Sequence, residues 1–474
     1  MTSLRAASTH HSRAPMRLRL SSVAIGIALV AAACSGGDNE QASPSTPEPA
    51  PAAVPTPEIF DVDVAAGTAS EFPPAPQVPD GPLHPNDQAA LETILANQAV
   101  GYAAQIPQLE TQRDARVLWV LADLLRFSQG VPDGEAILAT AGTISGTDFN
   151  PERPWRDLSE HLLAWDLPAP PNYLDYKAAV YIFADARWRF VFADPDATID
   201  YRLLSWGGVL LDDRELGDPD KCSRRCIPAL DDPALVSGSG GDWYPNDRVV
   251  FALEVEGDAV AFPRNIMETH EMVNITIGGR RLGIPYCTLC GSAQAFFTDE
   301  VSGVDRPPVL RTSGFLSRSN KVMYDLDSLT VFDTFTGKAV AGPLRADGVV
   351  LSQTSVVTTT WGDWRETHPD TSIVAEDGGI GRTYDEDPLR CRDDDGPIFP
   401  IGQVDERLEV QESVLGVALD GDVFLAFPVE AARNTLRNGD PVELQGVVVE
   451  LDGLGLRATV DGKPVATHQA FWFA

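Results

Sequence analysis

Two cysteines separated by two residues form the motif in this sequence with the clearest capacity for chemistry. They are Cys287 and Cys290, within the segment PYCTLCGS at 285–292. As thiolates they would provide half of a tetrahedral soft-metal site, and as a dithiol they can cycle through a disulfide. A permanent structural pair is the third interpretation. The motif by itself leaves all three open.

A histidine lies near this pair in the sequence. His270 precedes Cys287 by seventeen residues, a span that one hairpin covers, so its imidazole can return beside the thiols. We therefore expect Cys287 to be nucleophile or ligand, Cys290 its resolving partner or second ligand, and His270 base or third ligand. The alternative for His270 is a purely structural role.

A second histidine, His368, offers one more ligand position for the same metal, which these ligand types would make copper or zinc. It follows Trp361 and Trp364, whose presence core packing explains. A complete zinc knuckle would show a second C-x-x-C or an H-x-H pair, which the sequence lacks. The cofactor therefore stays unassigned between copper, zinc and none.

The other cysteines have different expected roles. Cys222 and Cys226 lie in a basic, loop-like stretch, and their short spacing favours a local disulfide over a metal site. Cys391 lies in a charged segment that indicates no partner. Cys34 directly follows three alanines at the end of an apolar run, and we assign it to lipidation.

Residues 1–33 are predicted to be a signal peptide. They contain four arginines and no acid, and end in an apolar run of about eleven residues, shorter than the roughly twenty that a transmembrane helix needs. The layout resembles a bacterial lipobox, which would make Cys34 the acylated N-terminus; a plain secreted protein is the alternative. Met16 is an alternative start. Residues 34–58, rich in Pro, Ala and Ser, are predicted to be a disordered tether.

The charge of the chain limits its partners. It carries 69 acidic and 36 basic residues, for a net charge of −33, and loss of the leader's four arginines makes this about −37. Such a surface repels phosphate backbones and anionic membranes, so we expect no nucleic-acid partner and attachment to the cell membrane only through the lipid. A protein or small-molecule partner stays unidentified.

Periodicity predicts an α+β protein with three folded segments. Residues 59–165 repeat apolar positions at helical spacing, 166–237 form an aromatic-rich connector, and 238–474 show the short alternating runs of mainly antiparallel strands. Two predicted hairpins, 249–262 and 273–286, flank the cysteine motif, and 414–428 echoes the first of them. We expect the β-rich segment to fold alone from about Asp166.

The sequence lacks the motifs of several enzyme classes. The sequence contains no G-x-S-x-G, P-loop, H-E-x-x-H or G-x-G-x-x-G motif, which disfavours the hydrolases, kinases and dehydrogenases that depend on them.

Taken together, a set of separate motifs resembles the DUF3179 family. The motifs are RNIMETHE (264–271), IPYCTLCGS (284–292), SGFL (313–316) and the Trp361, Trp364 and His368 cluster. The resemblance runs from about Trp165 to the C-terminus and departs at 332–335, where a Trp-Ser-Gln-like sequence is expected. The family has no known function, and its members include described selenoproteins, which implies redox chemistry if the selenocysteine falls in the cysteine motif.

The sequence therefore predicts an exported, lipid-anchored envelope protein with a His and C-x-x-C site. Thiol redox chemistry, similar to that of a thiol–disulfide oxidoreductase, or soft-metal binding is its leading function, and whether it is an enzyme stays open. The rival is a noncatalytic interaction module in which the cysteines form a structural disulfide.

Overall fold

The computed structural model describes residues 58–60, 72–219, 222, 225–390, 396–419 and 423–473. The chain divides into two units, residues 1–35 and 36–474, and every described residue belongs to the second. The expected signal peptide, Cys34 and Cys391 therefore lie outside the described residues. None of the described helices is both long enough and apolar enough to cross a membrane.

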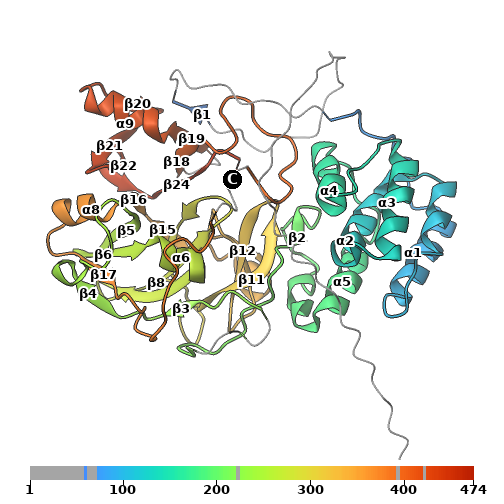
Figure 1. Ribbon diagram of the computed structural model, residues 1–474, viewed down its shortest axis with the longest axis horizontal. Helices are drawn as coiled ribbons and strands as arrows, with labels where there is room; N and C mark the ends of the chain where they lie inside the picture. Colours follow the sequence, from blue (N-terminus) through green and yellow to red (C-terminus); the bar gives the residue numbers. More distant parts are fainter. Residues whose placement is uncertain are drawn as a thin grey trace, which may run out of the picture. The chain divides into compact units, whose positions relative to one another are not determined.

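Residues 85–192 form a helical region (Figure 1), as the helical periodicity predicted. Proline opens α1, α3 and α4, a position where its missing N–H breaks no helical hydrogen bond. Part of the aromatic connector is itself helical. The helices are α1 (Pro85–Ala96), η1 (Ile106–Thr111), η2 (Ala115–Val117), α2 (Leu118–Ser128), α3 (Pro132–Ser145), α4 (Pro154–Ala164), α5 (Tyr173–Ala184) and η3 (Ala186–Phe192).

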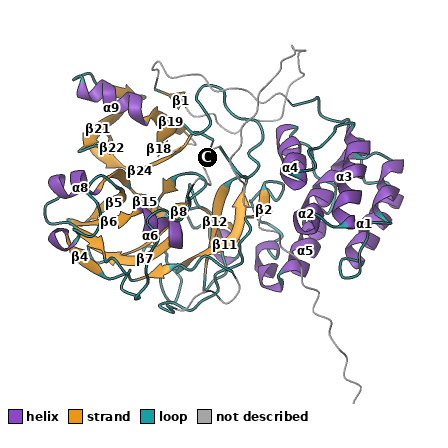
Figure 2. Cartoon of the chain, viewed as in Figure 1, coloured by secondary structure: helices purple, strands orange, loops and turns teal. Residues whose placement is uncertain are grey.

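The remainder of the described chain forms small, mainly antiparallel sheets arranged as a propeller-like ring, and the α+β prediction holds at this level (Figure 2). The sheet that carries the cysteine motif has the order β15-β10-β8-β7-β3, with β9 added to β8. Its strands are β3 (Leu230–Asp231), β7 (Met272–Ile277), β8 (Arg280–Cys287), β9 (Ser292–Ala293), β10 (Ala295–Phe297) and β15 (Ser352–Thr354).

Two five-stranded sheets, whose strands alternate along the chain with those of this sheet, have the orders β14-β13-β12-β11-β2 and β16-β5-β6-β17-β4. The strands of the first are β2 (Leu204–Trp206), β11 (Leu310–Ser317), β12 (Asn320–Asp325), β13 (Val331–Asp333) and β14 (Ala339–Ala341). Those of the second are β4 (Leu235–Ser237), β5 (Val249–Val255), β6 (Asp258–Pro263), β16 (Val357–Thr360) and β17 (Ser372–Val374).

Two further four-stranded sheets, β1-β19-β18-β24 and β20-β21-β22-β23, come from the last part of the chain, except for β1, which precedes the helices and pairs with β19. Their strands are β1 (Glu58–Ile59), β18 (Ser413–Leu419), β19 (Val423–Pro428), β20 (Val442–Leu444), β21 (Val447–Asp452), β22 (Gly455–Val460), β23 (Lys463–Val465) and β24 (Thr467–Phe471). The short helices among the sheets are η4 (Gly238–Gly240), α6 (Arg264–His270), α7 (Pro343–Ala346), α8 (Trp361–Thr367) and α9 (Val429–Arg437).

The predicted hairpins around the cysteine motif are confirmed. β5 pairs with β6 and β7 with β8, both antiparallel. The echo at 414–428 is also a hairpin, because β18 pairs antiparallel with β19. In both the first and the third hairpin a proline ends the second strand and a helix follows at once, α6 after Pro263 and α9 after Pro428. The sequence echo therefore corresponds to a repeated hairpin and helix.

The helical region and the β11 sheet share one hydrophobic core, which runs from Leu83 to Ala341. The indole N–H of Trp188 in η3 donates to the carbonyl of Ser313 in β11 at 3.0 Å. The rings of Phe127 in α2 and Trp206 in β2 stack with 5.3 Å between their centroids. Helices and strands are thus joined by aromatic packing as well as by the chain.

A buried ion pair lies within this shared core. The ammonium of Lys177 in α5 is 2.5 Å from the Asp123 carboxylate in α2, and the hydroxyl of Tyr173 donates to the same carboxylate at 2.9 Å. The two charged residues are only 1% and 5% exposed. The pair fixes the packing of α2 against α5, because each charge needs the other once water is excluded.

Candidate functional site

A tight turn brings the two cysteines of the motif together. Cys287 ends β8 and pairs with Ser292 of β9, so the residues between them form the turn of a small hairpin. The N–H of Cys290 donates to the carbonyl of Cys287 at 3.3 Å. Gly291 closes the turn with a φ of +60°, and a Cβ there would lie 3.0 Å from the Phe471 ring. The close approach explains why glycine follows the second cysteine.

Both cysteines are free thiols in the structure, and both are buried. Their sulfur atoms lie 2.9 Å apart. The carbonyl of Ser319 lies 3.8 Å from the Cys287 sulfur and 3.6 Å from the Cys290 sulfur. The motif is thus a preformed dithiol whose sulfurs need only a small movement to bond, because a disulfide has an S–S distance of about 2.05 Å.

The pKa values of the two thiols shift in opposite directions. Burial acts to raise the pKa of Cys287, but hydrogen bonds from the Cys290 thiol and from the backbone N–H groups of Lys321 and Cys290 outweigh it and hold the pKa below its usual value. Burial, and next the hydrogen bond with Cys287, raise the pKa of Cys290 well above its usual value. Cys287 is therefore the thiol that ionises first.

A buried acid–base pair lies beside the ionising thiol. The ammonium of Lys321 in β12 donates to the Glu271 carbonyl at 2.7 Å and lies 3.1 Å from the Glu271 carboxylate. The hydroxyl of Thr288 donates to the same carboxylate at 3.0 Å. Glu271, Lys321 and Cys287 all line a cavity of about 80 Å³, whose other walls are mostly apolar. We call this cavity the thiol cavity, and Cys287 forms part of its wall.

His270 does not join the thiols, which corrects the sequence prediction. Its Nδ1 lies 2.6 Å from the Pro228 carbonyl and its Nε2 lies 2.8 Å from the Tyr384 hydroxyl. The reason is local, because Glu271 adopts a left-handed φ of 52° that ends α6. His270 lines a different cavity from the one that Glu271 lines. Burial lowers the pKa of His270 to about 4, against the opposing hydrogen bond to Pro228.

His368 also lies apart from the thiols. Its ring stacks on Trp364 at 3.6 Å between centroids, and its Nδ1 lies 2.9 Å from the Thr367 hydroxyl. Within the described residues the one metal-like grouping of His, Cys, Asp and Glu side chains contains neither histidine nor the C-x-x-C thiols. The expected ligand set of two thiolates with His270 and His368 is therefore not assembled.

The disulfide expected between Cys222 and Cys226 is present, with 5.3 Å between the two Cα atoms. It lies beside the buried carboxylate of Asp212, whose Oδ1 is 3.6 Å from the Cys226 sulfur. These three residues are the metal-like grouping. Since the sulfurs are bonded to each other, they are not thiolates, and the group does not fit a metal in this state.

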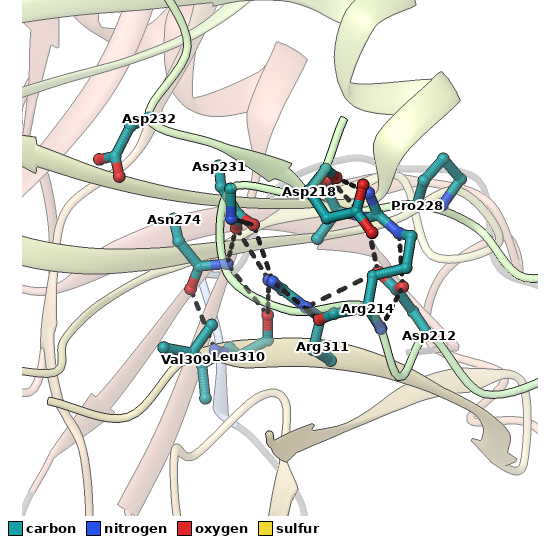
Figure 3. Close-up of polar contacts among 12 residues, drawn as sticks. Asp212, Arg214, Asp218, Pro228, Asp231, Asp232, Asn274, Val309, Leu310 and Arg311 are labelled. Carbon is teal, nitrogen blue, oxygen red and sulfur yellow. Dashed lines mark hydrogen bonds and ion pairs between the residues drawn. The ribbon is translucent and has the colours of Figure 1, made fainter. Parts of the chain in front are cut away.

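Asp212 instead belongs to a buried network of acids and arginines that sequence reasoning missed (Figure 3). Arg214 pairs with Asp212 through two hydrogen bonds of 2.7 and 2.9 Å. Arg311, fully buried in β11, pairs with Asp231 through two hydrogen bonds of 2.8 and 2.7 Å. Asn274 donates to Asp231 at 2.9 Å and exchanges two hydrogen bonds with Leu310. The network joins β3 and β7, which belong to the sheet that carries the cysteine motif, to β11 of another sheet.

The fold and site thus define a β-rich protein with a helical region and a buried dithiol. Residues 224–474 match the family described as "Protein of unknown function (DUF3179)". The match covers more than half of the chain, which therefore belongs to this family. Comparisons with curated proteins and with solved structures gave no match.

Proposed function

We propose that the protein carries out thiol–disulfide exchange at Cys287 and Cys290. The observation that supports this most is the pair of free, buried sulfurs 2.9 Å apart, of which one thiol has a lowered pKa and the other a raised one. That asymmetry suits a nucleophile and a resolving partner, because the thiolate is the attacking species.

The reaction balances with a small disulfide as substrate. The Cys287 thiolate attacks one substrate sulfur, a mixed disulfide forms, and the substrate S–S bond breaks to release a thiolate that takes up a proton. Cys290 then loses its proton and attacks the Cys287 sulfur, which forms the intramolecular disulfide and releases the second thiol. Two electrons pass from the dithiol to the substrate. The narrow thiol cavity favours a small disulfide or the tip of one chain over a folded surface.

Two measurements on one preparation test this proposal. Protein purified without oxygen is equilibrated with glutathione redox buffers and alkylated, and its thiols are counted by mass spectrometry, while bound zinc and copper are measured by elemental analysis. We expect two thiols that oxidise reversibly as one couple, at a potential above the roughly −300 mV typical of structural disulfides. Cys287→Ser and Cys290→Ser should each abolish the couple.

Two results would contradict the proposal. Near-stoichiometric metal that is lost in Cys287→Ser would assign the site to soft-metal binding. A disulfide that mild reductant leaves intact, and whose replacement only lowers the melting temperature, would assign the cysteines to a structural role in an interaction module.

We also propose that the chain is anchored to a cell-envelope membrane through a lipid on Cys34. The basic leader, the short apolar run and the three alanines before Cys34 support this. Cys34→Ser should move the protein from the membrane fraction to the soluble fraction. Mutant protein that stays on membranes after cleavage of its leader would overturn the anchor.

A further inference from the structure

A second cavity is lined by the sequence neighbours of two residues that line the thiol cavity. Ile227 and Glu271 line the thiol cavity, whereas their neighbours Pro228 and His270 line the second one. The second cavity measures about 480 Å³, within the range of sites that bind small organic ligands. Its polar lining residues are Arg214, Asp218, Asp231, His270, Arg382 and Thr383.

Most charges in this lining are already neutralised. Arg214 is paired with Asp212, and Asp231 is paired with the buried Arg311. Arg214 also donates to the Ala229 carbonyl at 2.8 Å. These side chains therefore form a fixed wall and have little capacity to take a new ionic partner.

Arg382 differs from them. Among the described residues, its guanidinium forms no hydrogen bond or ion pair, and it lies 5.5 Å from the ring centroid of Tyr384. The side chain is half-buried and lines the cavity. An arginine that is partly withdrawn from water without a carboxylate leaves its donors available to a bound anion.

The histidine beside Arg382 is held as a neutral, oriented group. The Pro228 carbonyl can only accept, so Nδ1 of His270 carries the proton and Nε2 accepts from the Tyr384 hydroxyl. The imidazole therefore adds no positive charge to the cavity. Two arginines line the cavity, and Arg214 is paired with Asp212. Arg382 is the one that has no ionic partner among the described residues.

We propose that this cavity binds a small organic monocarboxylate, whose two oxygens receive parallel hydrogen bonds from Arg382. One available guanidinium matches one carboxylate in charge and in planar geometry. A phosphate dianion fits less well, because it carries one charge more than a single guanidinium neutralises. The apolar Leu230 and Ile380 would contact the ligand's carbon chain. The proposal does not depend on the thiol chemistry.

Titration calorimetry on the mature chain, with residues 1–33 removed, tests the proposal with named probes. Lactate, hexanoate and benzoate are compared with their primary amides and with inorganic phosphate. We expect at least one carboxylate to bind at least about tenfold more tightly than its amide, because the amide loses the charge-assisted hydrogen bonds. Carboxylates that bind no better than their amides, or phosphate that binds more tightly than all of them, would overturn the proposal.

Variants then assign the binding to the arginine. Arg382→Gln should weaken binding of the tightest carboxylate by about tenfold or more. Arg382→Lys should weaken it less, because an ammonium keeps the positive charge but cannot donate two parallel hydrogen bonds. Arg437→Gln removes an exposed charge at the end of α9 and should change nothing. Cys287→Ser should also bind normally, which separates this site from the dithiol. Unchanged binding in Arg382→Gln, with the fold verified by circular dichroism, refutes the assignment.

Discussion

At the residue scale, the ionisation of Cys287 depends on the charges packed around it. Burial and then the Glu271 carboxylate act to raise the pKa of this thiol, whereas hydrogen bonds lower it. Glu271→Gln removes the negative charge and keeps an oxygen that can accept from Thr288. The pKa of Cys287 should therefore fall, and alkylation by iodoacetamide at neutral pH should become several-fold faster.

The rate of alkylation followed against pH measures this effect. Its midpoint should lie at lower pH in Glu271→Gln than in the wild type, and the control Glu443→Gln, an exposed change in β20, should leave it in place. A midpoint that moves to higher pH would show that the carboxylate acts on Cys287 in some other way than by its charge.

His270 gives the molecule a defined acid sensitivity. Its pKa is about 4 in the folded state against 6.5 for an ordinary histidine, so the unfolded state takes up the proton first as the pH falls. The contribution of His270 to the free energy of unfolding is therefore fully present above about pH 6.5 and is lost as the pH falls to about 4. The loss amounts to about 3 kcal/mol for this residue.

Urea unfolding between pH 7 and pH 4 tests the contribution of His270. His270→Asn keeps a donor for the Pro228 carbonyl but does not titrate, so the variant should show a shallower loss of stability. His468, whose pKa burial also lowers to about 4, should account for part of what remains. The exposed His84→Asn is the control. Equal slopes in His270→Asn and the wild type would rule out this role.

The sequence predicted the dithiol more successfully than it predicted its surroundings. The spacing of Cys287 and Cys290 was enough to place both thiols in one turn. The prediction that one hairpin covers the span between His270 and Cys287 is also confirmed, because β7 pairs with β8. The direction of the histidine side chain, however, follows from the left-handed backbone of Glu271, which a non-glycine residue gives no reason to expect.

At the scale of elements, the contact between α2 and α5 depends on a buried charge pair. Lys177→Met leaves the Asp123 carboxylate in the core without its cation and should lower the free energy of unfolding by about 3–5 kcal/mol. The double change Lys177→Met with Asp123→Leu should recover most of this loss. Urea denaturation of both variants gives the values.

A surface lysine provides the control for this pair. Lys463→Met in β23 should cost little, because that side chain is exposed. A loss below about 1 kcal/mol in Lys177→Met, or a double variant less stable than the single one, would show that the charge pair is not what joins the two helices.

Strands and helices could be predicted wherever the pattern is local. Alternation with turn residues located β5, β6, β7 and β8 closely, because each pair is joined by a short turn. The network of Arg311 and Asp231 was not predicted, since its partners are far apart in the sequence. The one signal for this network is Arg311, a charged residue within the otherwise strand-like segment 310–317. A charge buried in a strand needs a partner of opposite charge.

At the scale of the molecule, the helical region and the sheets share a core, which argues against the prediction that the β-rich part folds alone from about Asp166. A protein of residues 166–474 lacks α2 and exposes the rings that contact it, including Tyr181 and Trp206. We expect it to be insoluble or to bind a hydrophobic dye strongly, whereas residues 36–474 should unfold cooperatively. A soluble 166–474 protein with a melting temperature within about 5 °C of the longer chain would show that the β-rich part folds without α2.

The strand β24 has a consequence for the order in which the dithiol is enclosed. The N–H of Phe471 donates to the Cys290 carbonyl at 2.8 Å, and its ring covers Gly291. During synthesis the two cysteines leave the ribosome long before this strand does. Until β24 arrives, the turn that carries the two cysteines lacks this hydrogen bond and this ring contact, and the thiols are more open to oxidants and to mispairing with other cysteines. The newly made chain therefore passes through an interval in which its redox state is set by its surroundings rather than by its fold.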